Sequence, residues 1–277
     1  MATLSPLRYP GGKYKLRKYT KELIETNNLI GCTYVEPFAG GAGLALSLLD
    51  DHMVSRLILN DIDRSIYAFW YSVLHFTDIL CQRIADTAIN MDIWYEQKAV
   101  QENKENANLL DLGFSTFFLN RVNRSGILTG GVIGGYQQTG NYLMDCRFNK
   151  NDLIDRIQKI AAQRENIVFH NLDAIEFIHN IISSINEPAF VFLDPPYYHN
   201  GPKLYYNHYK HDDHLQLSKE IVTNIHHSYI VTYDNVDIIK AMYSPYCTVE
   251  EFDLAYSAQR KCTGKEVRFL SPDLTAV

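Results

Sequence analysis

An apolar run that ends in two prolines constrains the fold of this chain more than any other feature of its sequence. Residues Ala189–Leu193 read Ala-Phe-Val-Phe-Leu, and Asp194-Pro195-Pro196-Tyr197 follow them directly. A short apolar run bounded by breaker residues predicts a buried strand, and two prolines cannot continue the hydrogen-bonded ladder, so the chain leaves the sheet there. In open α/β sheets, ligands bind just beyond the carboxyl ends of the strands. We therefore expect chemistry at this junction.

The residues after this run suit a planar ligand that carries an amine. The Asp194 carboxylate and the Pro195 carbonyl can accept the amine hydrogens, and the Tyr197 ring can stack on the plane. A simpler interpretation is an aspartate-proline turn at a strand end, because both residue types are common in turns. A second motif is needed to choose between them.

That motif is a glycine turn between a short strand and a helix. Thr33–Val35 predicts the strand and Leu44–Leu49 the helix, with Gly40, Gly41 and Gly43 in the turn between them. Glycines permit a tight turn and a close approach of a nucleotide-like ligand to the backbone. Their spacing does not fit the G-x-G-x-x-G pattern of dinucleotide-binding loops.

A second strand, Arg56–Asp61, ends in an acid about 20 residues past the glycines, where a carboxylate that binds ribose hydroxyls is expected. The glycine turn and Asp61 together indicate a ligand that contains adenosine. The alternative is a glycine turn that serves helix packing alone.

The third motif lies at the amino end, where Pro10-Gly11-Gly12-Lys13 follows Tyr9. The order of the motifs is Pro-Gly-Gly-Lys, Val-Glu-Pro-Phe with its glycine turn, Asn-Asp-Ile-Asp, a long insertion, and Asp-Pro-Pro-Tyr. In this order the chain resembles the Dam-type, D12-class family of DNA adenine methyltransferases over nearly its whole length.

The resemblance implies an enzyme that uses S-adenosylmethionine to methylate adenine in double-stranded DNA. It implies that the catalytic motif is Asp194, Pro195, Pro196 and Tyr197, which is present without substitution. It also implies the contacts to the cofactor. Tyr9 and Lys13 contact the methionine end, Phe38 and Gly40 line the cofactor cleft, Asp61 holds the ribose, and Asp173 contacts the adenine.

The residues also suggest the mechanism. If Asp194 and the Pro195 carbonyl accept both amino hydrogens, the adenine nitrogen becomes more tetrahedral and its lone pair points at the methyl group. Positioning of this kind is worth about 7 to 11 kcal/mol. The base must leave the duplex, and Tyr197 replaces part of the lost stacking. The reaction needs no metal.

Length and composition allow one sizeable α/β core, since the chain has 277 residues and is 46% hydrophobic. Alternating strand and helix patterns predict a mainly parallel sheet, and the resemblance implies a Rossmann-like core of class I S-adenosylmethionine-dependent methyltransferases. The later strands are expected at Ile167–His170, Ala189–Leu193, Ser228–Tyr233 and Val267–Leu270. We expect the catalytic core at residues 1–75 and 166–277, with a mostly helical DNA target-recognition subdomain inserted at 76–165.

The insertion departs from family members that read GATC, because Thr129 stands where those members carry an arginine. Threonine cannot make the bidentate contact to guanine that arginine makes. We therefore predict a different target sequence. The candidate DNA-binding residues are Arg121, Asn123, Arg124, Gln137, Gln138, Asn141 and Arg147. Each of them has the alternative role of capping a turn in a glycine-rich loop.

A net charge of −6 is unusual for a nucleic-acid binder. Basic residues do cluster near both ends of the chain, either to meet phosphates or as ordinary solvated faces: Arg8, Lys13, Lys15, Arg17, Lys18, Lys21, Arg260, Lys261, Lys265 and Arg268. The cluster of His208, His211, Asp212, Asp213 and His214 is interpreted as a helix start, with Asp212 or Asp213 as the cap, rather than a metal site. The cysteines Cys32, Cys81, Cys146, Cys247 and Cys262 are odd in number and lack metal-ligand spacing. We therefore interpret the cysteines as reduced thiols. Together with the lack of a recognisable signal peptide or membrane-spanning run, they predict a cytoplasmic protein.

Other functions stay open. A methyltransferase of RNA or of a protein amide is one alternative, although the aspartate at position 194 and the large insertion favour adenine in DNA. A sequence-specific DNA-binding module without turnover is another, and the intact Asp194 and Tyr197 argue against it. The sequence does not decide whether the enzyme acts alone or with a cognate restriction or defence partner, or what its oligomeric state is.

Overall fold

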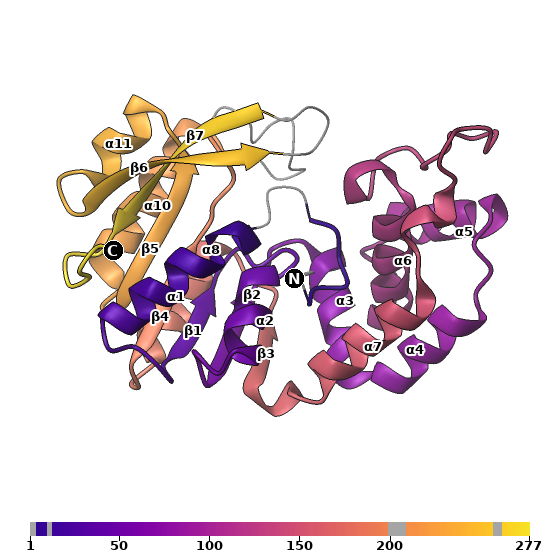
Figure 1. Cartoon of the computed structure of the whole chain (residues 1–277), viewed down its shortest axis with the longest axis horizontal. Coiled ribbons are helices and arrows are strands. Elements are labelled where there is room, and N and C mark those ends of the chain that lie inside the picture. Colours follow the sequence, from indigo (N-terminus) through magenta and orange to yellow (C-terminus); the bar gives the residue numbers. More distant parts are fainter. Residues whose placement is uncertain (1–3, 10–12, 199–208, 257–261) are drawn as a thin grey trace. The chain divides into compact units, whose positions relative to one another are not determined.

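The computed structural model of the chain describes residues 4–9, 13–198, 209–256 and 262–277. Its strands form one seven-stranded sheet in the order β3-β2-β1-β4-β5-β7-β6 (Figure 1). Their bounds are β1 Thr33–Glu36, β2 Arg56–Asn60, β3 Ile167–His170, β4 Ala189–Leu193, β5 Ser228–Asp234, β6 Thr248–Tyr256 and β7 Cys262–Leu270.

Parallel pairing dominates the centre of the sheet. β1 runs parallel to both β2 and β4, and β4 runs parallel to β5. β7 is antiparallel to β5 and to β6. The order 3-2-1-4-5 is that of a doubly wound Rossmann sheet, in which ligands bind beyond the carboxyl ends of the strands. The predicted α/β fold class with a mainly parallel sheet is confirmed.

β4 is apolar throughout, which suits its position in the middle of the sheet. Every residue of Ala189–Leu193 is buried, as expected for a parallel strand covered on both faces. The strand ends at Leu193, as predicted, because the prolines that follow cannot pair. The sequence did not predict β6, which lies at the edge of the sheet and carries three acidic residues, Glu250, Glu251 and Asp253, among its apolar ones.

The chain divides into two compact units. The sheet unit comprises Lys13–Ala39, Ser47–Asn60 and Leu172–Val277. The helical unit comprises Met1–Gly12, Gly40–Leu46 and Asp61–Asn171. The predicted division into a core at 1–75 and 166–277 and an insertion at 76–165 stays a prediction.

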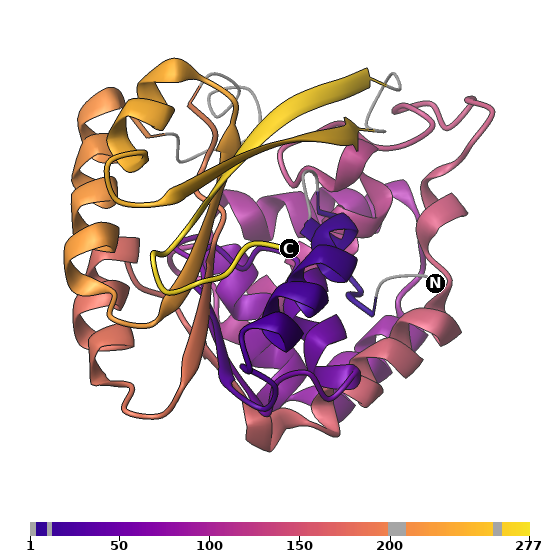
Figure 2. The same cartoon turned by 60° about the vertical axis from the view of Figure 1, so that its left-hand side comes forward.

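Helices cover both faces of the strands in the sheet unit. α10 and α11 lie on one side of the strands and α1 on the other (Figure 2). The core on the first side joins Phe177 of α8, Leu217 of α10 and Tyr243 of α11 to Val191 of β4. The helices are η1 Lys13–Leu16, α1 Arg17–Thr26, α8 Ala174–Asn180, η5 Ile182–Ser184, α10 His211–Asn224 and α11 Asp237–Tyr243. A further helix, α2 Gly43–Asp50, begins in the residue range of the helical unit and ends in that of the sheet unit.

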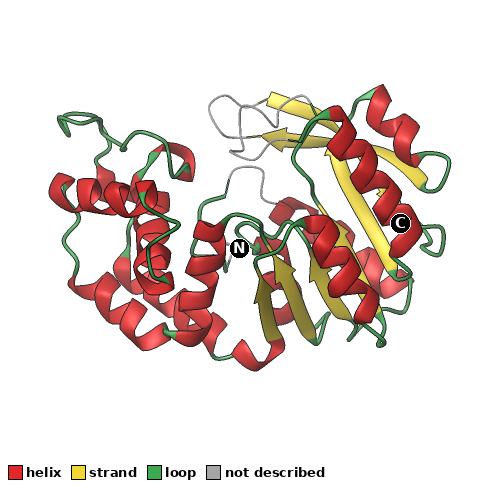
Figure 3. Ribbon diagram, turned by 180° about the vertical axis from the view of Figure 1, so that it is seen from behind, coloured by secondary structure: helices red, strands yellow, loops and turns green. Residues whose placement is uncertain are grey.

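The helical unit consists mainly of helices and loops (Figure 3). Short polar side chains start several of its helices, as in α3, where Asp63 accepts from the Ser65 N–H at 2.9 Å. The Phe69 and Phe117 rings stack at 6.0 Å and join α3 to α6. The helices are α3 Arg64–His75, α4 Thr77–Asp86, α5 Met91–Glu102, α6 Leu109–Val122, η2 Arg124–Gly126, η3 Met144–Arg147, α7 Lys150–Ala161 and η4 Arg164–Asn166.

The histidine-rich segment starts α10 earlier than expected. The helix begins at His211 with Lys210 as its N-cap residue, so the predicted cap at Asp212 or Asp213 is wrong. Asp213 instead accepts a hydrogen bond from the Lys210 N–H at 2.8 Å. His208 lies outside the described residues, and the described ones contain no group of His, Cys, Asp or Glu side chains that could hold a metal ion.

Candidate active site

Asp194 lies directly beyond the carboxyl end of β4, where its carboxylate has charged and polar neighbours. Lys13 Nζ lies 2.9 Å from Asp194 Oδ1, and both side chains are largely buried. Thr232 of β5 donates to the same oxygen at 2.8 Å. Among the described residues, none donates to Oδ2, so this oxygen is available to a ligand.

The next residues of the motif turn the chain away from the sheet. Pro195 is buried and Pro196 half-buried, and the described part of the chain contains no cis peptide bond. Within that part, no hydrogen bond reaches the Pro195 carbonyl. Asp194 Oδ2 and this carbonyl are therefore two acceptors one residue apart.

Tyr197 connects the motif to two distant charged residues. Lys13 Nζ donates to the Tyr197 hydroxyl at 2.6 Å and lies 4.8 Å from the ring centroid. The hydroxyl in turn donates to Oε1 of Glu266 on β7. Burial raises the pKa of Glu266, with Asp194 and Asp234 raising it further and Lys13 opposing them. Neither Glu266 nor Thr232 was predicted from the sequence, since nothing local marks either residue as functional.

The helical unit holds the glycine turn together with Asp61. The carboxylate of Asp61 accepts from the Gly40 N–H and from the Asp63 N–H, each at 2.9 Å. The indole of Trp70 donates to the Gly40 carbonyl at 2.9 Å. Gly40 has φ +47°, and a Cβ there would lie 2.6 Å from the Tyr9 ring, so the turn requires glycine for two reasons.

Burial dominates the electrostatics of Asp61. It raises the pKa of the carboxyl to about 7, against the two backbone donors, which lower it. A carboxylate has about four lone-pair positions, and the backbone donors occupy two of them. Asp61 therefore keeps acceptors for a pair of ligand hydroxyls, a good fit to a ribose.

In the sheet unit, Asn60 forms hydrogen bonds to two neighbouring loops, a role that was not predicted from the sequence. Its Nδ2 donates to the Pro37 and Leu172 carbonyls at 3.1 and 3.0 Å, and its Oδ1 accepts from the Leu172 N–H at 2.9 Å. These bonds hold the residue directly before each of two predicted cofactor contacts, Phe38 and Asp173. Phe38 is half-buried, and Asp173 is exposed and caps α8 by accepting from the Ile175 N–H.

Some of the predicted DNA-binding residues form hydrogen bonds within the glycine-rich loop at residues 123–147 of the helical unit. Arg121 Nε donates to the Arg147 carbonyl at 2.7 Å, and burial lowers the pKa of Arg121 to about 10. Asn123 is fully buried, accepts from the Trp94 indole at 2.8 Å and donates to the Ile127 carbonyl at 3.0 Å.

Gln138 also bonds to the loop. Its amide donates to the Ile133 and Gly135 carbonyls at 2.8 and 2.7 Å and accepts from the Met144 N–H at 3.0 Å. The remaining candidates have exposed side chains that can reach a partner: Arg124, Gln137, Asn141 and Arg147.

The N-terminal segment is bound to this loop through Arg8. The Asn120 side chain accepts from the Arg8 N–H at 2.7 Å and donates to the Arg8 carbonyl at 2.8 Å. The Arg8 guanidinium donates to the Asn123 carbonyl at 3.1 Å. A Cβ on Gly126 would lie 2.3 Å from the Arg8 carbonyl oxygen, so this contact requires glycine.

Several residues of the predicted basic clusters contact other parts of the protein. Arg17 forms a bidentate pair with Asp51, and Arg268 pairs with Glu250 at 2.6 Å. Arg260 and Lys261 lie outside the described residues. Much of the basic charge near the chain ends is thus used in folding.

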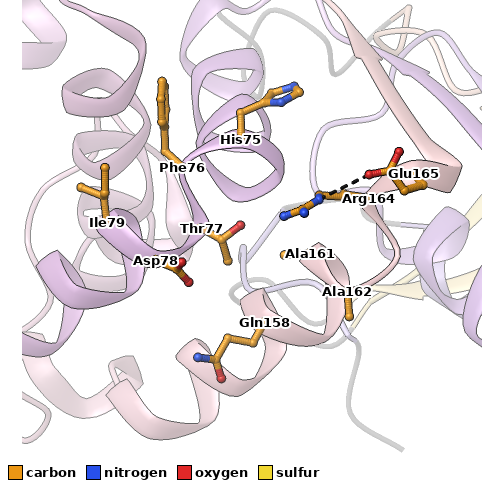
Figure 4. A pocket seen from close by; sticks show the side chains of 10 residues that line it. All are labelled: His75, Phe76, Thr77, Asp78, Ile79, Gln158, Ala161, Ala162, Arg164 and Glu165. Carbon is orange, nitrogen blue, oxygen red and sulfur yellow. Dashed lines mark ion pairs between the residues drawn. The ribbon is translucent and has the colours of Figure 1, made fainter.

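A separate cavity of about 520 Å³ lies in the helical unit (Figure 4). It is lined by residues at the junction of α3 with α4, including Phe76, by residues at the end of α7, and by the Arg164–Glu165 ion pair. None of the predicted site residues lines it.

The doubly wound fold, the glycine turn with Asp61 and the motif after β4 suit an enzyme with a nucleotide cofactor, and a sequence comparison identifies its class. Residues 9–256 match the model of the D12 class N6 adenine-specific DNA methyltransferases. The match covers most of the chain, so the protein belongs to this family. It is an S-adenosylmethionine-dependent DNA adenine methyltransferase, which confirms the predicted family, enzyme class and cofactor.

Solved structures of other methyltransferases are similar to the chain. The rRNA methyltransferase aviRa from Streptomyces viridochromogenes has a TM-score of 0.43 and 13% identity, with 95% of this chain and 86% of that chain covered. TrmK of M. capricolum, in complex with S-adenosylhomocysteine, has a TM-score of 0.39 and 10% identity, with 91% and 68% covered. No curated protein sequence matches the chain. Among the described helices, none has the length and apolarity needed to cross a membrane.

Replacing Asp61 with alanine is expected to weaken the binding of S-adenosylmethionine by about 5- to 150-fold, or about 1 to 3 kcal/mol, because ribose hydroxyls would lose their acceptor. Calorimetric titration measures the affinity. Asp78→Ala removes an exposed acid from α4 of the same unit and serves as the control. Unchanged affinity in Asp61→Ala would exclude the ribose assignment.

Proposed function

We propose that the protein is a site-specific DNA adenine-N6 methyltransferase that methylates the exocyclic amine of an adenine flipped out of duplex DNA. The observation that carries this proposal is the pair of acceptors beyond β4, Asp194 Oδ2 and the Pro195 carbonyl, beside the buried Tyr197. The exocyclic amine of adenine has two hydrogens to donate, and these two neighbouring acceptors can each take one of them. Tyr197 supplies an aromatic ring for stacking.

The acceptors act on the nucleophile. Adenine's amine is a weak nucleophile because its lone pair is delocalised into the ring. When Asp194 and the Pro195 carbonyl accept its hydrogens, the nitrogen becomes more tetrahedral and its lone pair is directed away from the ring. The bound cofactor supplies an electrophilic methyl group. Asp194 or water then takes the proton that the methylated nitrogen releases.

The cofactor contacts are proposed residue by residue. We assign the ribose to Asp61, with Gly40 keeping the turn open for close approach. Tyr9 and Lys13 are assigned to the methionine end, Phe38 to the cleft and Asp173 to the adenine. The hydrogen bonds of Asn60, which fix the chain beside Phe38 and Asp173, support these two assignments.

The insertion at 76–165 is proposed to read the target sequence. The exposed side chains of Arg124, Gln137, Asn141 and Arg147 are suited to contact base edges or phosphates. The internal hydrogen bonds of Arg121, Asn123 and Gln138 suit residues that hold the loop in shape for recognition. The enzyme is proposed to act inside the cell on its DNA, with a cognate restriction or defence partner as one biological setting.

The recognised sequence is expected to differ from GATC, because Thr129 cannot make the arginine contact to guanine that is worth about 1 to 3 kcal/mol. Sequencing that detects N6-methyladenine in plasmid DNA from expressing cells tests both the function and the site. Changing Arg124 to alanine should relax or shift the methylated sequence, and Gln138→Ala should alter it by loosening the loop. Methylation confined to GATC, with both variants unchanged, would contradict this proposal.

A further inference from the structure

The Asp-Pro-Pro-Tyr motif belongs to a longer chain of interacting groups. The order of contacts is Asp194 carboxylate, Lys13 ammonium, Tyr197 hydroxyl and Glu266 carboxylate. All four groups lie in the sheet unit. The ammonium therefore lies between one carboxylate in direct contact and a second that it reaches through a phenol.

Glu266 is an unusual residue for its position on β7. It is 1% exposed, and its cross-strand neighbours are Asp234 on β5 and Phe252 on β6. The ionisable groups that act on it are Lys13, Tyr197, Asp194 and Asp234. A buried carboxylate beside two other acids is costly unless it is paired. The Tyr197 hydroxyl and the nearby ammonium provide that pairing.

Resting on the function proposed above, we infer that Glu266 is a positioning residue for methyl transfer. It acts through the Tyr197 hydroxyl to hold the Lys13 ammonium against Asp194, and it does so only as a carboxylate. The residue does not touch the substrate.

The reason is the direction of the hydrogen bonds. An ionised carboxylate can only accept, so it turns the Tyr197 hydroxyl hydrogen toward itself and leaves the phenol oxygen lone pair to Lys13. A protonated Glu266 can donate to that oxygen and compete with Lys13. The ammonium then loses a partner, and the orientations of both Tyr197 and Asp194 loosen.

Activity should follow the charge of Glu266. Since burial raises the pKa of this carboxyl, the rate of methyl transfer should fall on acidification at a pH above the ordinary range for a glutamate, about 4.3. The variant Glu266→Gln, which cannot ionise and which carries donor hydrogens, resembles the protonated state. It should show a low rate that no longer depends on this ionisation.

The test compares pH–rate profiles of the full-length enzyme on a plasmid that contains the mapped target. Glu266→Gln is expected to lower kcat at neutral pH by about tenfold or more, since small misplacements cost up to about a hundredfold. The KM for S-adenosylmethionine, which Lys13 is proposed to contact, should change by a smaller factor than kcat, and the fall in rate on the acid side of the profile that is assigned to Glu266 should disappear. A wild-type rate with an unchanged profile would overturn the inference.

Glu250→Gln is the matched control. Glu250 lies on β6 of the same hairpin and accepts from the Tyr19 hydroxyl at 2.8 Å, so it reproduces a glutamate–tyrosine bond away from the motif. Its variant should keep the wild-type pH profile. A loss of the acid limb in Glu250→Gln as well would overturn the specific role of Glu266.

A second variant covers the case in which Glu266→Gln does not fold. Tyr197→Phe leaves Glu266 in place but removes the hydroxyl that joins it to Lys13. It should lose the same acid limb, and adding Glu266→Gln to it should lower kcat little further, as expected for residues that act as a unit. An acid limb retained in Tyr197→Phe would overturn the inference.

Unfolding in urea separates this inference from the proposed function. The pKa of Glu266 is higher in the folded state than in the unfolded state. The carboxyl therefore stabilises the folded protein below the unfolded-state pKa, and this stabilisation is lost as the pH rises through the folded-state pKa. The urea midpoint of Glu266→Gln should therefore rise relative to wild type between pH 5 and pH 8. An equal difference at both pH values would overturn the inference. Absence of methyl transfer by the wild type would refute the proposed function alone.

Discussion

Replacing Asp194 with alanine is expected to lower the rate of methyl transfer to DNA by about a hundredfold or more, which is the range for removing one hydrogen-bonding group that acts on the charge developing in a transition state. The affinity for S-adenosylmethionine should change little, because the carboxylate is proposed to act on the substrate amine. Transfer of labelled methyl groups to mixed-sequence duplex DNA measures the rate, and calorimetry measures cofactor binding.

The control for Asp194→Ala is Glu187→Ala, which removes an exposed acid just before β4, at the opposite end of the same strand. It should keep the wild-type rate. Because Asp194 pairs with the buried Lys13, both variants are assayed well below their unfolding temperatures. An Asp194→Ala rate above about a tenth of wild type, a loss below about 1.4 kcal/mol, would contradict the proposed mechanism.

Changing Gly113 to alanine is expected to destabilise the protein by about 1 to 3 kcal/mol through overpacking. In an ordinary helix the same change stabilises by about 0.5 to 1 kcal/mol. The sign reverses because a Cβ at Gly113 of α6 would lie 2.3 Å from Ser72 Oγ and 2.5 Å from the Ala68 carbonyl oxygen of α3. A serine can rotate away, but the Ala68 backbone cannot. Urea unfolding measures the change in the free energy of unfolding.

Gly131→Ala is the matched control for Gly113→Ala. Apart from its two chain neighbours, no described residue has an atom within 4 Å of a Cβ at Gly131, so the free energy of unfolding of Gly131→Ala should stay within about 0.5 kcal/mol of wild type. If Gly113→Ala were as stable as wild type or more stable, α3 and α6 could not pack as closely as the structure has them.

The strands were predictable where the sequence is apolar or bounded by breakers. β3 and β4 have the predicted bounds, and β1, β2 and β5 differ by at most one residue at one end. Apolar periodicity and proline act over a few residues and can be recognised without knowledge of the fold. β6 was missed because an edge strand needs little apolar sequence. The predicted β7 was too short because its first residues, Cys262–Lys265, form little apolar sequence and pair with β6 beyond the stretch that pairs with β5.

The candidate site was predictable in its motifs but not in its contacts. Asp61, Asp194 and Tyr197 were found because each follows a recognisable turn or strand. The internal hydrogen bonds of Asn123 and Gln138 were not foreseen, since a polar side chain in a glycine-rich loop has the same sequence signal whether it faces a ligand or the loop's own backbone. The roles of these residues stay predictions until the variants are measured.

The sequence by itself determined the family, the parallel core and the motif at the end of β4, since these depend on residue types and on neighbours along the chain. Only the tertiary structure decided which groups surround the motif. Lys13 meets Tyr197 across 184 residues of sequence, and Glu266 meets it across 69. Such partners depend on strand order and register, which arise from the packing of the whole sheet and leave no local pattern in the chain.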